Sequence, residues 1–91
     1  MDYKYEKENS RVAVYDDGKE IGECTYSQSK GLWIIDHTFV DPTYRGQHIA
    51  ENLVKEVVDK AREEGVKIIP LCPYAKKEFD RKEEYQDMLQ K

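Results

Sequence analysis

The sequence is short of cysteine and of long apolar runs, and each shortage excludes a class of protein. Its two cysteines, Cys24 and Cys72, are too far apart in the sequence for a thioredoxin-like pair and too few for a zinc site. We therefore expect two free thiols. No apolar run approaches the roughly 20 residues that cross a bilayer, and no charged and then apolar leader follows Met1. These absences predict a cytoplasmic protein that uses neither a membrane nor a bound metal.

Positive charge is also in short supply. The chain has 15 lysine and arginine residues against 19 aspartate and glutamate residues, which gives a net charge of −4 at pH 7. This balance argues against nucleic-acid binding, which relies on neutralising phosphates, and it suits a cationic partner such as an amine. With 91 residues the chain is too short for two hydrophobic cores, so we expect one domain over residues 1–91. We expect a monomer or a weak dimer.

Three strands are predicted in the first part of the chain. Alternation in Arg11 to Tyr15, followed by the turn signal Asp16-Asp-Gly18, predicts a hairpin whose second strand runs from about Lys19 to Ser27. A polar turn then leads into Leu32 to Val40, where almost every residue is apolar or aromatic. That composition predicts a central strand covered on both of its faces. The charged residues 1–9 are expected either to add a short edge strand or to fray.

An amphipathic helix is predicted next. Apolar side chains recur at i, i+4 spacing from Ile49 to Ala61, with charged side chains on the outer face that include a Glu51–Lys55 pair. Gly65 suits a left-handed cap that ends the helix.

A further short strand and two helices are predicted after this cap. Lys67 to Leu71 reads as a short buried strand, and because a crossover helix precedes it, it should lie parallel to the Leu32–Val40 strand. Pro73 suits the first turn of a short helix, and a second short helix is predicted from about Lys82 to Gln90.

The connection before the long helix has the composition of a phosphate-binding loop. In Val40-Asp-Pro-Thr-Tyr-Arg-Gly-Gln-His-Ile-Ala50, an apolar strand leads through a turn and an Arg-Gly step into the helix. Amides at a helix start lack intrahelical partners and carry partial positive charge, so successive N–H groups from Arg45 to Ala50 can point at a pyrophosphate. The alternative is an ordinary strand-to-helix connection with a proline-containing turn.

The segment Tyr44-Arg-Gly-Gln-His-Ile-Ala50 resembles the acyl-CoA pyrophosphate loop of the GNAT superfamily of acetyl-CoA-dependent acyltransferases. The superfamily pattern is Gln/Arg-x-x-Gly-x-Gly/Ala. Arg45 and Ala50 fit this pattern, whereas His48 stands where the central glycine is usual. We expect the ring of His48 to face solvent while its amide still serves the phosphate; a direct contact of the ring with a phosphate is the alternative.

The resemblance extends beyond the loop. It also includes His37-Thr-Phe-Val40 upstream and Pro70-Leu-Cys-Pro-Tyr74 downstream, and it runs from about Val12 to Leu89. With these segments the chain resembles small single-domain GNAT-like proteins that are often known only as predicted acetyltransferases. A full-length GNAT domain is larger. The resemblance therefore implies the loss of the early helices and the last strands, which help to shape the acceptor pocket.

The resemblance implies an α/β (α+β) fold of the GNAT type. Antiparallel strands would lead into the parallel βαβ unit, the central sheet would splay, and short helices would end the chain. The pantetheine arm of acetyl-CoA would lie between the two parallel strands at their carboxyl ends, where ligands are expected in such sheets. The implied cofactor-binding residues are Phe39, Val40, Arg45, Gly46, Gln47, His48, Ile49 and Ala50.

Cys72 and His37 are candidates for the chemistry. Cys72 lies at a strand end beside a predicted helix start, where a thiol can protonate a departing CoA thiolate or contact the acceptor; a buried apolar residue is the alternative. Histidine titrates near neutral pH, which suits His37 as the base for the acceptor amine, and a core histidine is the alternative. Strand alternation puts His37 on the same strand face as Trp33, Ile35 and Phe39, and it puts Asp36 on the opposite face.

Tyr74 is the third candidate. GNAT enzymes often use a tyrosine from this helix as the acid for the thiolate, and the resemblance implies that role for Tyr74. It comes earlier than in the usual pattern, where Phe79 would lie closer to the expected position. Packing is the alternative role.

The predicted function is transfer of an acetyl group from acetyl-CoA to an amine, on a small molecule or a protein, through a ternary complex. One alternative is a non-catalytic acyl-CoA-binding or protein-interaction module that kept the phosphate loop but lost the acceptor site. Another is a thiol acyl carrier in which Cys72 itself becomes acetylated.

Overall fold

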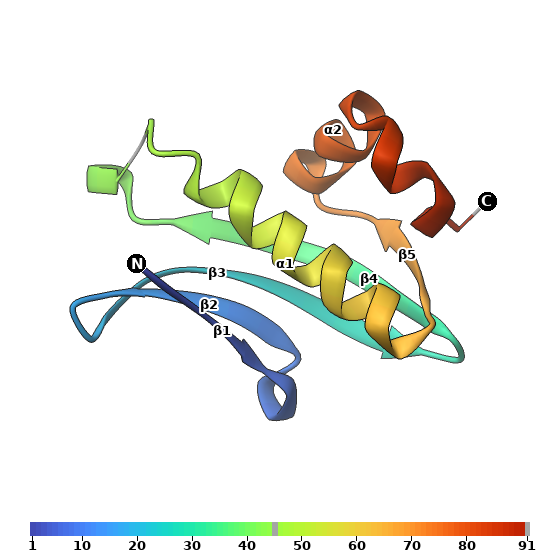
Figure 1. Cartoon of the computed structure of the whole chain (residues 1–91), viewed down its shortest axis with the longest axis horizontal. Coiled ribbons are helices and arrows are strands. Elements are labelled where there is room, and N and C mark those ends of the chain that lie inside the picture. Colours follow the sequence, from blue (N-terminus) through green and yellow to red (C-terminus); the bar gives the residue numbers. More distant parts are fainter. Residues whose placement is uncertain (45, 91) are drawn as a thin grey trace.

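A computed structural model describes residues 1–44 and 46–90 of the chain (Figure 1). The strands are β1 (Asp2–Glu6), β2 (Arg11–Asp16), β3 (Lys19–Ser29), β4 (Leu32–Val40) and β5 (Lys67–Pro70). The helices are α1 (Ile49–Glu64) and α2 (Pro73–Arg81), and short 3₁₀ segments span Lys7–Asn9, Pro42–Tyr44 and Glu83–Met88. Neither α-helix is long and apolar enough to span a bilayer.

The strands form one sheet in the order β1-β2-β3-β4-β5. From β1 to β4, each strand pairs antiparallel with the next one along the chain, whereas β4 and β5 pair parallel. This arrangement confirms the predicted hairpin and the predicted βαβ unit. The charged start of the chain forms the edge strand β1, with Tyr3 and Tyr5 packed against the core.

α1 packs on the sheet through the apolar face that the sequence predicts. Its buried side chains are Ile49, Leu53, Val54, Val57, Val58 and Ala61. The helix ends at Gly65, whose φ of 72° gives the predicted left-handed cap. On the outer face Lys55 pairs with Asp59 at 3.0 Å, and the predicted pairing with Glu51 is wrong because that carboxylate lies beside His48 instead.

β4 is covered on one face only, which corrects the prediction of a strand covered on both faces. Figure 1 shows α1 and α2 on the same side of the sheet. Trp33 and Ile35, which face these helices, are 3% and 0% exposed. Leu32 and Ile34 point the other way and are only half-buried. The apolar composition of β4 therefore exceeds what its packing requires.

A β-bulge in β4 changes which residues face the helices. Tyr26 pairs with Ile35 and Thr25 pairs with His37, so Asp36 is an extra strand residue that pairs with no residue of β3. The predicted alternation fails here, because the extra residue shifts every later side chain to the other face. His37 and Phe39 consequently lie on the uncovered face and not beside Trp33 and Ile35, and Phe39 is 49% exposed.

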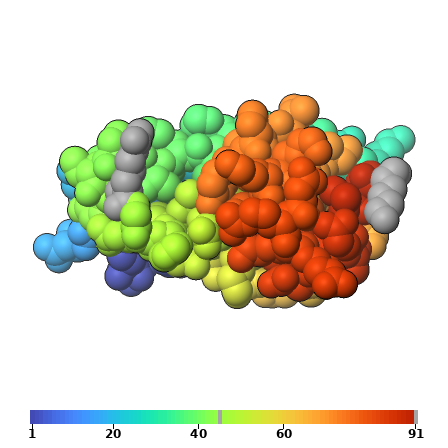
Figure 2. Space-filling view, turned by 90° about the horizontal axis from the view of Figure 1, so that it is seen from above, coloured from blue at the N-terminus to red at the C-terminus, as the bar shows by residue number. Residues whose placement is uncertain are grey.

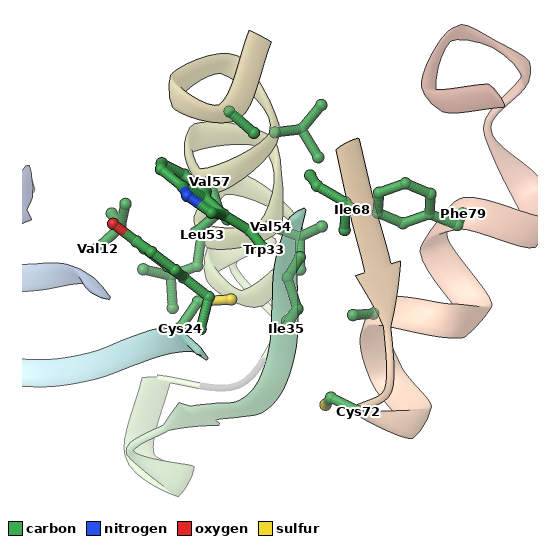
Figure 3. Close-up of a cluster of buried hydrophobic side chains, with 14 of the residues drawn as sticks. Val12, Cys24, Trp33, Ile35, Leu53, Val54, Val57, Ile68, Cys72 and Phe79 are labelled. Carbon is green, nitrogen blue, oxygen red and sulfur yellow. The ribbon is translucent and has the colours of Figure 1, made fainter. Parts of the chain in front are cut away.

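The core gathers between the sheet and the two helices. Figure 3 shows side chains from β2, β3, β4, β5, α1 and α2 converging there, including Trp33, Ile35, Ile68 and Phe79. The ring of Trp33 stacks on Tyr26 with 3.9 Å between centroids. Cys24 and Cys72 are both buried and both free, which confirms the prediction of two thiols.

The C-terminal segment closes the free edge of β5. Its predicted second helix is a 3₁₀ segment, Glu83–Met88, with Tyr85 and Met88 buried. Leu89 then forms a parallel bridge to Ile68, and the Gln90 amide donates to the Ile68 carbonyl at 2.9 Å. Covering an exposed strand edge in this way protects it from pairing with other chains.

Candidate active site

The two parallel strands part at their carboxyl ends, as predicted. Their pairing runs from Leu32 and Lys67 to Ile35 and Pro70 and stops there. The amides of Leu71 and Cys72 both donate to the Ile35 carbonyl, at 3.0 and 2.9 Å. β4 continues to Val40 while the chain after β5 turns away into α2, which opens a gap beside the last part of β4.

A cleft of about 360 Å³ lies at this end of the molecule. It is bounded by the end of β4, the following loop, the start of α1 and one side chain of α2. Figure 2 shows the start of α1 in yellow-green next to α2 in orange. The described residues that line the cleft are Val40, Tyr44, Gly46, His48, Ile49, Ala50, Glu51 and Tyr74.

Most of the implied CoA-binding residues therefore surround one cleft. Val40, Gly46, His48, Ile49 and Ala50 line it, whereas Phe39 and Gln47 do not. Arg45, also an implied CoA-binding residue, lies outside the described residues.

The first part of the loop is held by its own hydrogen bonds. Asp41 Oδ1 accepts hydrogen bonds from the Thr43 amide at 2.9 Å and from Thr43 Oγ1 at 2.8 Å. The Tyr44 hydroxyl donates to Asp16 Oδ2 at 2.7 Å, which ties the loop to the end of β2. Pro42 and these contacts fix the approach to the cleft.

The second part of the loop presents backbone amides. Gly46 and His48 both have left-handed backbones, with φ values of 83° and 58°. The first intrahelical bond of α1 runs from the Asn52 amide to the His48 carbonyl at 3.1 Å. The amides of Ile49 and Ala50, which precede it, have no partner within the helix, and the capping residue offers no side-chain bond. Such amides at a positive helix end suit an anion.

Cys72 is buried and held by a hydroxyl. It is 8% exposed at the start of α2, and its Sγ lies 3.7 Å from Thr38 Oγ1. The same hydroxyl lies 3.5 Å from Cys24 Sγ, so Thr38 separates the two thiols. Burial raises the pKa of the Cys24 thiol to about 12, which keeps it protonated. Cys24 is thus a neutral, buried thiol of the core.

Tyr74 is the catalytic candidate that lines the cleft. Burial, followed by the nearby charges of Glu78 and Glu51, raises its pKa to about 12. The phenol therefore keeps its proton at neutral pH, as a proton donor must.

His37 lies on the uncovered face of β4 and is exposed. Next to it, the Asp36 carboxylate accepts hydrogen bonds from Thr25 Oγ1 at 2.6 Å and from Ser27 Oγ at 2.8 Å. Burial opposes ionisation of Asp36, but these bonds and the neighbouring His37 hold its pKa below the usual value. The bulge thus puts Asp36 and His37 side by side, which corrects the prediction that they lie on opposite faces.

Three residues near the cleft were not predicted as site residues. Tyr44 is the first residue of the loop segment that carries the resemblance, and this position was its only signal in the sequence. Glu51 falls in the first turn of α1, where a carboxylate beside a phosphate loop is a visible signal. Thr38 had no such signal, because only the bulge turns it towards the thiols.

The family model described as "GCN5-related N-acetyl-transferase" matches residues 4–88. A search of curated proteins found no match. Among solved structures, a GCN5-like protein from Staphylococcus aureus is 31% identical, with a TM-score of 0.78; the alignment covers 98% of this chain and 87% of that chain.

Two larger enzymes share the fold. The ribosomal-protein-S18-alanine N-acetyltransferase of Escherichia coli is 16% identical with a TM-score of 0.66, over 78% of this chain and 49% of that one. The aminoglycoside N-acetyltransferase AAC(6')-Iy, solved in complex with CoA, is 19% identical with a TM-score of 0.59, over 78% and 63%. At these identities the likeness shows the fold alone. Taken with the family match, the parted strands and the loop leading into α1 show that this chain belongs to the GCN5-related N-acetyltransferase (GNAT) family.

Proposed function

We propose that the protein transfers an acetyl group from acetyl-CoA to an amine. The observation that carries this proposal is the cleft, where the left-handed Gly46 and His48 lead into the start of α1 beside the parted strands. The first amides of this helix lack intrahelical partners. The residues fit the cosubstrate, because amides without intrahelical partners suit its pyrophosphate and the apolar Val40 and Ile49 suit its pantetheine arm. When bound, acetyl-CoA would supply an activated thioester.

Two proton transfers are needed, one to the CoA thiolate and one from the acceptor amine, and the candidate side chains for them lie on opposite faces of β4. Tyr74, with its raised pKa, holds a proton inside the cleft for the CoA thiolate. Cys72 is a weaker candidate for that role, because its thiol is buried against Thr38 and does not line the cleft. His37 is exposed on the uncovered face of β4, where it can accept a proton from an amine that approaches from that side of the sheet.

Binding of CoA is tested by removing a single amide. Ala50 is in the first turn of α1, where proline is tolerated and no intrahelical bond is lost. We expect Ala50→Pro to weaken CoA binding at least about tenfold in isothermal titration, the cost of one hydrogen bond to a charged group. Ala50→Ser keeps the amide and is the matched control. Absence of CoA binding to the wild-type protein at millimolar ligand would contradict the proposal.

A non-catalytic CoA-binding module is the second candidate function. The uncovered face of the sheet favours it, because an enclosed acceptor pocket needs walls on the side where His37 is exposed. Release of CoA thiol with a panel of amines separates the two functions: turnover supports the enzyme, and tight CoA binding without turnover supports the module. The thiol-carrier alternative predicts that acetyl-CoA alone adds one acetyl mass to Cys72.

A further inference from the structure

A carboxylate shares the mouth of the cleft with the amides that suit a phosphate. Glu51 lies in the first turn of α1 and lines the cleft together with Gly46, His48 and Ala50. Its side chain is 31% exposed. A carboxylate in a first turn is stabilised by the positive end of its helix, just as a phosphate is. Glu51 therefore uses the same partial charge that a bound pyrophosphate would use.

His48 is the partner of this carboxylate. The Nδ1 atom of His48 lies 3.3 Å from Glu51 Oε1. The His48 side chain is 75% exposed, so the pair lies at the rim of the cleft and not at its floor. When the imidazole is protonated, it neutralises the carboxylate and adds a positive charge at the cleft entrance. A glycine at this position would offer neither effect.

We propose that Glu51 sets the affinity of the cleft for CoA by competing with the pyrophosphate for the start of α1. His48 limits this competition by pairing with the carboxylate. This inference rests on the proposed function, because it concerns the same cleft. The competition is electrostatic, so it acts on the phosphates of the ligand and leaves its uncharged pantetheine part unaffected.

The test compares Glu51→Gln with a matched charge change on the same helix. Glu63 is 68% exposed near the other end of α1, and Glu63→Gln is the control. By isothermal titration at low ionic strength, we expect Glu51→Gln to bind CoA about fivefold more tightly than the wild type. Glu63→Gln should match the wild type. Pantetheine, which lacks phosphates, should bind all three proteins equally.

A double-mutant cycle tests the role of His48. Asparagine tolerates a left-handed backbone, so His48→Asn removes the imidazole without straining the loop. We expect this change to weaken CoA binding about threefold when Glu51 is present and to have no effect in the Glu51→Gln background. A loss that persists in that background would show a direct contact between His48 and the ligand, and would overturn its role as a partner of Glu51.

The outcomes separate this inference from the proposed function. Equal CoA affinity of Glu51→Gln, Glu63→Gln and a CoA-binding wild type would overturn the inference and leave the proposed function intact. Absence of CoA binding to both the wild type and Glu51→Gln would overturn both. Glu51→Ala, which also lacks the carboxylate, must reproduce the tighter binding. Thermal melting of each variant checks that it is folded.

Discussion

Tyr74 combines three properties that few tyrosines in the chain share. It follows the Cys72-Pro73 step at the start of α2, it lines the cleft, and its pKa is raised to about 12 by burial and then by the charges of Glu78 and Glu51. A half-buried phenol that does not ionise at neutral pH keeps a proton available for a thiolate. These properties favour a chemical role over packing alone.

Removal of the Tyr74 hydroxyl tests that role. We expect Tyr74→Phe to lower the rate of acetyl transfer about a hundredfold, which is typical for loss of a positioned proton donor, while CoA affinity stays near the wild-type value. The measurement is CoA thiol release under saturating acetyl-CoA. Tyr85 has a pKa raised to about 12 by burial but does not line the cleft, so Tyr85→Phe is the matched control. An undiminished rate in Tyr74→Phe would assign Tyr74 to packing.

At the scale of the element, the bulge at Asp36 decides how β4 meets its neighbours. Before the bulge β4 pairs with β5, and after Ile35 that pairing has ended. Bulges bend a strand and increase its local twist. The extra residue and the parting of the strands therefore fall at the same place, and the gap beside the end of β4 follows from the bend.

Deletion of Asp36 should close this gap without unfolding the protein. Tyr26–Ile35 and Thr25–His37 would become neighbouring pairs of a regular ladder, so the later residues would keep their present faces. We expect a cooperative thermal transition together with CoA binding at least about tenfold weaker, because a straighter β4 narrows the space for the ligand. Asp36→Gly keeps the extra residue and serves as the control. CoA affinity equal to the wild type would separate the bulge from the binding site.

The bulge also marks the limit of what the sequence predicts. Periodicity identified α1 and its cap at Gly65, and turn residues identified the β2–β3 hairpin, because these signals are local. Asp36 has no local signal, since an extra strand residue is recognised only against its partner on β3. Residue type and resemblance identified the candidates His37, Cys72 and Tyr74. They could not predict that His37 lies on the opposite face of β4 from the other two, because that placement depends on the bulge.

At the scale of the whole molecule, one hydrophobic core holds side chains that can ionise only at alkaline pH. Cys24 is fully buried, and burial raises the pKa of its thiol to about 12 from an ordinary value of 9.0. Burial likewise raises the pKa values of Tyr74 and Tyr85 to about 12 from 10.0. These groups are neutral at pH 7 in both the folded and the unfolded chain, so their ionisation does not change the stability near that pH.

Above pH 9 the two states differ. The unfolded chain releases the thiol proton near pH 9, whereas the folded chain retains it until about pH 12. The stability contributed by the neutral Cys24 is therefore fully present below pH 9 and is lost progressively as the pH rises towards 12. The expected loss in the free energy of unfolding is roughly 1 kcal/mol for each pH unit in this window. The two tyrosines act in the same direction above pH 10.

Urea unfolding between pH 8 and pH 10.5 measures this dependence. We expect the free energy of unfolding to be level near pH 8 and to fall above pH 9. Cys24→Ala should make the fall shallower, because it removes the buried thiol that the folded chain keeps neutral. Val57→Ala is the control: it also truncates a buried side chain and lowers stability at every pH, but it removes no titrating group, so its slope should equal that of the wild type. An identical slope in Cys24→Ala would mean that burial of the thiol does not govern alkaline stability.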